Sequence, residues 1–506
     1  MRTTIAAALA LCAALLSGAA QAQPQQQHLR MALREDPDIL DPTLSRTYVG
    51  RIVYAALCDK LFDIDERLQL VHQLAAAHRW EDPRTLVITL REGVRFHDGE
   101  VMDAEAVRYS LNRHLTMQGS FRRSEINDME AVEVVDPRTV RIRLRQPSAS
   151  FLSQLTDRAG MIVSPKAAEA MGRNFGTRPV CAGPFRFVER VAQERIVVER
   201  FPEYWDAGRV HLNRITYLPI PDNTVRLANL QSGAVEFAER MEPEHIPAIR
   251  RDRRLRFVAV DELGWQSLQI NVGNGARADT PLGRDPRVRH ALELALDRQA
   301  IVQVVYGGMY TPTVQPLPPA NPYHVASLRP EPRDVARARA LLREAGATAP
   351  LPVELLVPNN PDLRQVGEVI QAMAGEAGFD IRLRAIEFAS GLQAAQRGEF
   401  ELWLVGWSGR VDPDGNIYSF FVTGGGNNDG RYSNPEADRL MNAARAELDQ
   451  EKRKALYEQL LQILVRQDRP RIFLWHRKNI MAHSARVTGY RPVPDGLIRV
   501  QDLRLD

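Results

Sequence analysis

Strand patterns and helix patterns interleave along almost the whole chain, and this alternation constrains the fold more than any other feature. Residues 139–144 alternate apolar and charged side chains, as a half-buried β-strand does. The helix expected after Asp103 instead places Val107, Leu111 and Leu115 four residues apart, on one face. Because segments of both kinds follow one another repeatedly, the sequence predicts an α/β protein rather than an all-β or all-helical one.

The second half of the chain has the clearest helix boundaries. Asp285, Asp297 and Asn434 each precede an amphipathic segment as an N-cap does, and Gly346 and Gly378 each follow one. Further elements expected in this half are helices over 333–345, 361–377 and 450–466 and strands over 381–383, 400–406 and 472–475.

The first residues have the pattern of a secretory signal peptide. Arg2 precedes the apolar run 5–16, and the small-residue site 20–22 follows it. A lipid-anchored form needs a cysteine directly after that run, but Cys12 lies inside it. We therefore expect cleavage after Ala22 and a soluble periplasmic protein.

The size and charge of the chain beyond the signal peptide argue against a single-domain protein and against a nucleic-acid-binding protein. It exceeds the roughly 250–300 residues at which a single core stops growing, so more than one domain is expected. The 66 Lys and Arg residues nearly balance the 63 Asp and Glu residues, which argues against a nucleic-acid partner. The arginine-rich segment 250–254 is interpreted as a solvated turn. No later apolar stretch approaches the length of about 20 residues that spans a bilayer.

Two cysteines remain beyond the signal peptide, Cys58 and Cys181. In an oxidising compartment they are candidates for a disulfide, which would close a loop of about 120 residues and contribute roughly 4–5 kcal/mol by the chain-entropy argument. Two separately buried thiols are the alternative. Neither cysteine belongs to a C-x-x-C pair, so a zinc or redox motif is not expected.

Catalysis has no convincing motif. Residues 97–100 (His-Asp-Gly-Glu) suggest acid–base chemistry or metal ligation, but they stand between a strand and a helix cap, where such side chains satisfy turn backbone. The segment 406–410 resembles a nucleophile elbow but ends in Arg410 instead of glycine, and no H-E-x-x-H is present. We therefore expect no enzyme activity, metal or cofactor.

Four spaced blocks of sequence resemble the solute-binding proteins of peptide and nickel importers, known as extracellular family 5 or the dipeptide/oligopeptide-binding group. The blocks are Leu90–Gly99 with Tyr109–Leu111, Tyr204-Trp205 through Gly233, Asp285–Ala291 through Gly307, and Gly398–Phe400 through Asp414. They occur in the family order and cover essentially the whole chain beyond the signal peptide.

The resemblance implies a two-lobed periplasmic-binding-protein clamshell of the large peptide-binding class, with mixed sheets and a hinge between the lobes. Lobe one would comprise 23–267 and 480–506, and lobe two 268–479. It also implies a monomeric component of an ABC importer, which captures a peptide or peptide-like solute and delivers it to permease subunits in the inner membrane. A ligand-sensing accessory protein and a binder of metal complexes are the alternatives, although the eleven histidines are scattered.

Three aromatic residues are candidates for ligand contact. Trp407 follows the end of a strand, Trp475 lies near the return crossing between the lobes, and Tyr432 adjoins the Gly-rich segment 423–430, which we expect to be a surface loop. Core packing is the alternative role for an aromatic side chain in a strand.

Arg410 is the most informative departure from the family pattern. In dipeptide- and oligopeptide-binding members, an aspartate three residues past the tryptophan holds the peptide ammonium group, and Arg410 stands at that place here. A guanidinium suits a carboxylate or phosphate, so the resemblance predicts an anionic group on the ligand and weak binding of ordinary dipeptides. Asp412 or Asp414 could take over the ammonium role; a simple ion pair of Arg410 with one of them is the alternative.

Overall fold

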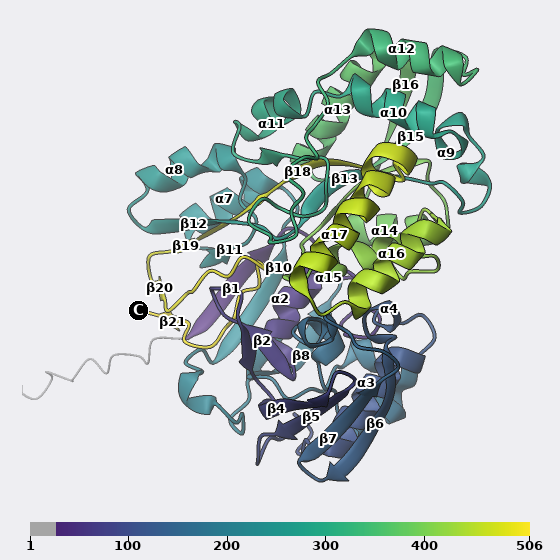
Figure 1. The fold of residues 1–506 in the computed structure, drawn as a ribbon. Coiled ribbons are helices and arrows are strands. Elements are labelled where there is room, and N and C mark those ends of the chain that lie inside the picture. Colours follow the sequence, from purple (N-terminus) through teal and green to yellow (C-terminus); the bar gives the residue numbers. More distant parts are fainter. Residues whose placement is uncertain (1–26) are drawn as a thin grey trace, which may run out of the picture.

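The structure, a computed structural model, describes residues 27–506. The predicted signal peptide and its cleavage site after Ala22 lie outside this range. Figure 1 shows the C-terminal segment returning to the N-terminal part of the chain. There the side chain of Gln27 donates to the carbonyl of Leu505 at 2.8 Å. The two ends of the described chain therefore belong to the same half of the molecule.

A seven-stranded mixed sheet forms the centre of this half, in the order β12-β19-β11-β1-β10-β9-β8. Strand β1 runs parallel to both of its neighbours, β10 and β11, and the other pairings are antiparallel. The strands are β1 His28–Leu33, β8 Phe185–Val191, β9 Arg195–Arg200, β10 Arg214–Pro219, β11 Phe237–Ala238, β12 Leu255–Asp261 and β19 Lys478–Ser484.

A four-stranded antiparallel sheet extends this half, in the order β4-β5-β7-β6. Its strands are β4 Ala75–Asp82, β5 Thr85–Leu90, β6 Met129–Asp136 and β7 Thr139–Leu144. The predicted strand over 139–144 is confirmed as β7. Helix α3 (Ala104–Thr116) packs on this sheet, and the predicted cap is confirmed because Asp103 accepts from the backbone of Ala106 at 3.0 Å.

Cys58 and Cys181 form a disulfide bond in the structure. Cys58 directly follows helix α2 (Tyr48–Leu57), and Cys181 precedes β8. Both sulfur-bearing residues are buried in the apolar core beneath the seven-stranded sheet. The bond therefore joins two segments far apart in the sequence inside one core.

A six-stranded mixed sheet forms the other half, in the order β14-β18-β13-β17-β15-β16. The strands are β13 Trp265–Ile270, β14 Thr311–Pro312, β15 Leu351–Pro358, β16 Phe379–Ile386, β17 Leu402–Trp407 and β18 Arg471–His476. The larger helices of this half are α10 Pro286–Ala295, α11 Arg298–Tyr306, α12 Val335–Glu344, α13 Pro361–Glu376, α14 Phe388–Gln396, α15 Asp414–Phe421, α16 Pro435–Ala446 and α17 Gln450–Leu461.

The predicted helix boundaries of this half agree with the structure, with one difference. Asp285, Asp297 and Asn434 accept backbone hydrogen bonds as N-caps, and Gly346 and Gly378 follow their helices at positive φ. The helix expected over 450–466 is α-helical only to Leu461; residues 462–468 continue as a π-helix.

The chain passes between the two large sheets twice, from β12 to β13 through 262–264 and from β18 to β19 through residue 477. At this crossing Arg477 pairs with Glu262 at 2.8 Å. The chain thus passes from one sheet to the other at residues 262–264 and 477. The lobe boundaries predicted from the sequence are at 267/268 and 479/480. We call the half with the seven-stranded sheet lobe one and the half with the six-stranded sheet lobe two.

Candidate ligand-binding site

A cavity lies between the two large sheets. Lobe two contributes residues of β13 and β17, and lobe one contributes residues that follow β1 and β11. Its aromatic lining includes Trp265 and Trp407, which are direct neighbours on paired strands, together with Phe388 and Phe420. Apolar walls of this kind bind the body of a small solute, and polar groups fix its orientation.

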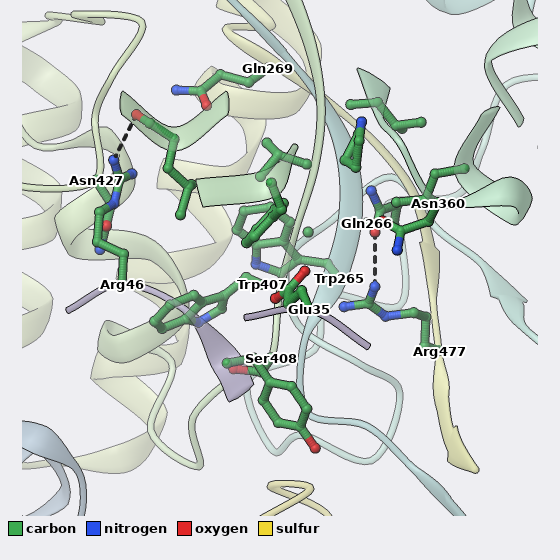
Figure 2. A pocket seen from close by; sticks show the side chains of 18 of the residues that line it. Glu35, Arg46, Trp265, Gln266, Gln269, Asn360, Trp407, Ser408, Asn427 and Arg477 are labelled. Atoms are coloured by element: carbon green, nitrogen blue, oxygen red, sulfur yellow. Dashed lines mark hydrogen bonds between the residues drawn. The ribbon is translucent and has the colours of Figure 1, made fainter. Parts of the chain in front are cut away.

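Amide side chains supply many of the polar groups at the cavity. Gln266 and Gln269 come from β13, Asn360 precedes α13, and Asn427 comes from the Gly-rich segment, all visible in Figure 2. An amide offers both a donor and an acceptor, so these side chains suit the carbonyl and N–H groups of a peptide-like ligand.

The Gly-rich segment 423–430 is a loop, but only Thr423 and Gly424 are exposed, so the predicted surface position is wrong for most of it. Asn427, Asn428 and Asp429 are buried, and Asn427 and Asp429 line the cavity. The amide of Asn428 donates to the carbonyls of Val422 and Tyr432 at 3.0 and 2.7 Å. These bonds to backbone replace water, and they let a segment rich in glycine pack inside the protein.

Most charged side chains of the cavity are neutralised by partners. Arg34 binds Asp362 through two hydrogen bonds of 2.7 and 2.8 Å, and Arg46 binds Asp429 with a closest approach of 2.6 Å. Both pairs join lobe one to lobe two, so the structure shows the lobes in contact with each other.

Arg240 and Arg477 share the buried carboxylate of Glu262, at 2.7 and 2.8 Å. This group of charges lies at the crossing between the lobes. Arg477 also donates to Gln266, a bond drawn in Figure 2.

Two charged groups at the cavity have no ionic partner among residues 27–506. The carboxylate of Glu35 accepts no hydrogen bond there, and burial raises its pKa to about 7, an effect that Arg240 and Arg34 partly oppose. The guanidinium of Arg471 forms no ion pair; burial lowers its pKa to about 9.

Comparison with known proteins decides the family. The family model described as bacterial extracellular solute-binding proteins, family 5 Middle, matches residues 69–429. The chain belongs to this family. The resemblance seen in the four sequence blocks is confirmed, and family 5 consists of solute-binding proteins rather than enzymes.

The relatives include proteins named for their ligand. The glutathione-binding protein GsiB of Pectobacterium atrosepticum is 31% identical over 481 residues, which cover 92% of each chain. GsiB of Escherichia coli O1:K1 / APEC is 28% identical over 513 aligned residues, which cover 98% of each chain.

Solved structures show the fold. The Helicobacter pylori periplasmic binding protein DppA in complex with the peptide STSA has a TM-score of 0.87 at 22% identity, covering 94% of this chain and 98% of that one. AgaA of A. tumefaciens R10 in complex with agropinic acid has a TM-score of 0.86 at 23% identity, covering 95% and 99%. The predicted α/β fold of two-lobed periplasmic binding proteins with mixed sheets is thus confirmed.

Of the five residues proposed from the sequence for ligand contact in this family 5 protein, Trp407 lines the cavity. Its Nε1 donates to the carbonyl of Gly415 and to Oδ1 of Asn416, both at 3.1 Å, so the indole ring is held in a fixed orientation. The ring packs edge-on against Phe420 at 4.9 Å between centroids. Trp407 can therefore offer a rigid aromatic surface.

The other four residues lie outside the lining of this cavity. Trp475 is fully buried in the core of lobe two, 5.3 Å from the ring of Tyr306. Tyr432 donates to Asp468 at 2.5 Å. Asp412 binds Arg453 through two hydrogen bonds of 2.7 Å.

Arg410 is buried and pairs with neither of the aspartates considered from the sequence. Its guanidinium binds Asp157 of lobe one at 3.0 Å and lies 4.4 Å from the ring centroid of Trp407. The alternative pairing with Asp412 or Asp414 is wrong because Arg453 and Arg445 occupy those two carboxylates.

Sequence reasoning missed the charged groups of the cavity, above all Glu35 and Arg471. One signal was present for Arg471: it opens the otherwise apolar segment that forms β18, and a charge in a buried strand needs a reason. Glu35 follows β1 without any comparable signal.

His97 has a structural setting. It lies outside the cavity and hydrogen-bonds the carbonyl of Gly183 at 3.0 Å. Within residues 27–506, no cluster of three or more His, Cys, Asp or Glu side chains could hold a metal ion. No helix in the described part of the chain is both long and apolar enough to cross a membrane.

Proposed function

We propose that this family 5 protein is the periplasmic solute-binding component of an ABC importer and that it captures a small peptide or peptide-like solute between its lobes. The observation that carries the proposal is the cavity between the lobes, whose lining mixes aromatic rings with amides and charged groups from both lobes.

Closure of the two lobes around a ligand supports the transport role. Four ion pairs link the lobes: Arg34–Asp362, Arg46–Asp429, Arg410–Asp157 and Arg445–Asp128. A ligand that contacts both sheets stabilises the closed form by its differential affinity for that form. The permease subunits then recognise the closed form, and the protein acts as a monomer with no nucleic-acid partner.

The ligand class rests on the chemistry of the lining and on the names of the relatives. Amide side chains and charged groups surround the aromatic surface, which suits a short peptide better than an uncharged sugar or a lipid. Glutathione, named for the GsiB relatives, is a tripeptide with one ammonium and two carboxylate groups. It therefore heads the solutes to be tested.

Two measurements test this function. Native mass spectrometry of protein taken from its own periplasm should show one bound small solute, on a monomer whose mass corresponds to a start at Gln23. After unfolding and refolding to remove that solute, titration with glutathione, dipeptides and tripeptides should change the tryptophan fluorescence, since Trp265 and Trp407 line the cavity. Trp407→Phe should lose much of this signal.

Trp80→Phe is the matched control because Trp80 lies on β4, away from the cavity. A ligand-free protein from the periplasm that responds to no small solute would overturn the proposed function. Growth on the recovered solute should depend on the cognate permease genes; growth that survives their deletion would indicate sensing rather than transport.

A further inference from the structure

Glu35 and Arg471 are the charged groups of the cavity that no described residue neutralises. The other lining charges are engaged: Arg34 and Arg46 bind aspartates, and Arg240 and Arg477 share Glu262. Arg471 is buried and Glu35 is half-buried, and a charge withdrawn from water without a partner costs far more free energy than a paired one. The two groups therefore mark where a ligand supplies what the protein lacks.

The carboxylate of Glu35 needs hydrogen-bond donors. An ionised carboxylate is an acceptor only, and the two nearby guanidinium groups, Arg34 and Arg240, already bind other carboxylates. Figure 2 shows the Glu35 side chain pointing into the cavity that Trp265 and Trp407 also line. A ligand ammonium group has the three donors and the charge that this carboxylate lacks.

The guanidinium of Arg471 needs an anion. Arg471 is 4% exposed, and its hydrogen bond within the described chain goes from Nη1 to the hydroxyl of Ser267 at 2.9 Å. Its Cζ lies 4.6 Å from the ring centroid of Trp265, which is within the range of a cation–π interaction. Asp429, which is close enough to raise the pKa of Arg471, is occupied by both Nη atoms of Arg46.

The two groups belong to different lobes. Glu35 follows β1 of the seven-stranded sheet, and Arg471 begins β18 of the six-stranded sheet. A ligand that satisfies both groups must touch both lobes at once.

We propose that the ligand is a zwitterion whose ammonium group binds Glu35 on lobe one and whose carboxylate binds Arg471 on lobe two, so that a solute with both charges stabilises the closed form more than a solute with one. This inference rests on the proposed function and adds the charge pattern and the orientation of the ligand. The ammonium group is assigned to Glu35 and not to the position of Arg410, because Arg410 is a cation engaged with Asp157. The amides of Gln266 and Gln269 lie along β13 and are available to the middle of the ligand.

A pH dependence follows from the geometry. The charged groups that act on Glu35 are Arg240 and Arg34, which favour its ionised form, and Glu239 and Glu387, which disfavour it. With burial, the balance puts the pKa of Glu35 at about 7 without ligand. An ammonium partner favours ionisation, so binding at pH 7 should release about half a proton. Affinity should fall as the pH drops below 7.

Two variants, each tested against two peptide derivatives, test the proposal. Wild-type protein should bind a dipeptide or tripeptide about 10- to 150-fold more tightly than its N-acetylated form, and by a similar factor more tightly than its C-terminal amide, as expected for one charge-assisted hydrogen bond each. Glu35→Gln should abolish the first preference and keep the second. Arg471→Gln should abolish the second and keep the first.

Calorimetry in buffers of different ionisation enthalpy adds an independent readout. Wild-type protein should release protons on binding at pH 7, and Glu35→Gln should release none. If Arg471→Gln does not fold, Arg471→Lys keeps the charge without the fork and should show a partial loss. In each variant, one of the two chemical modifications of the peptide should no longer lower its affinity. If both modifications lowered the affinity equally in either variant, the charge assignment would be overturned.

Native mass spectrometry separates this inference from the proposed function. Should the solute recovered from the periplasm lack an ammonium group or a carboxylate, the zwitterion proposal fails while the binding function stands. If no solute binds at all, both fail.

Discussion

The guanidinium of Arg410 in lobe two binds the carboxylate of Asp157 in lobe one, with 3.0 Å between Nη2 and Oδ1. Arg51 of lobe one binds the same carboxylate and also donates to the hydroxyl of Ser408 at 2.9 Å. Burial alone would raise the pKa of Asp157, but Arg410, Arg51 and Arg158 together hold it well below its ordinary value. Asp157 is therefore an ionised link between the lobes.

Arg410→Met should weaken closure without unfolding lobe one. Asp157 would keep Arg51 and Arg158, whereas the closed form would lose a charge-assisted hydrogen bond of about 1.5–3 kcal/mol. We expect ligand affinity to fall about 10- to 100-fold and small-angle scattering to show a larger radius of gyration at subsaturating ligand. Arg439→Met is the control, since its pair with Glu436 is exposed and local. Unchanged affinity in Arg410→Met would contradict the link.

Replacing both Cys58 and Cys181 with serine should destabilise lobe one. The bond closes a loop between residues 123 positions apart, which corresponds to about 5 kcal/mol by the chain-entropy argument. Denaturant unfolding should show the loss, and reduction of the wild type should reproduce much of it. Peptide mapping without reductant should recover one cross-linked species; two freely alkylated thiols would argue against a bond in the mature protein.

In His97→Gln, the free energy of unfolding should decrease less steeply as the pH falls. Burial lowers the pKa of His97 to about 4, and the bond to Gly183 only partly offsets this. A histidine with a lowered folded pKa takes up a proton on unfolding, so its contribution is present above pH 6.5 and lost as the pH falls towards 4. Each such proton changes the slope of unfolding free energy by about 1.4 kcal/mol per pH unit. Glutamine keeps a donor for Gly183 but cannot titrate. Chemical unfolding between pH 4.5 and 6.5 measures the slope, and an identical slope in the variant would refute the assignment.

Gly264→Ala should disturb the crossing between the lobes. A β-carbon at Gly264 would stand 1.7 Å from the carbonyl oxygen of Trp407, so the backbone must move. We expect lower thermal stability and loss of ligand binding. Gly375→Ala is the matched control: that exposed position in α13 has open space around it, and removing a helical glycine should stabilise by about 0.5–1 kcal/mol. If the two variants had the same free energy of unfolding in urea, the crossing would tolerate the backbone movement.

Local patterns predicted the elements of this protein well, as Asp103 and Asn434 illustrate. Both residues cap helices through side-chain bonds to backbone two or three positions ahead. Strand β7 likewise follows from the alternation of its own six residues. Such interactions span a few residues, so the sequence displays them directly.

The candidate site was predicted only where a family pattern marked it, as at Trp407. Trp475, which we expected near the return crossing between the lobes, was a candidate of the same kind, yet it is fully buried beside Tyr306. Which face of a strand meets the cavity depends on the helices that cover the other face. That information is absent from the strand itself.

The α/β class, the caps and turns, and the membership of family 5 could be predicted from the sequence alone, because these depend on short-range periodicity and on residues in a fixed order. The ionic partners could not be predicted in this way. Arg410 bound Asp157, 253 positions away, instead of the aspartates beside it, and Arg34 bound Asp362 across the cavity. A buried charge pairs with whichever opposite charge folding brings within reach, and the packing of the two lobes sets that choice. The same packing left Glu35 and Arg471 without partners at the cavity.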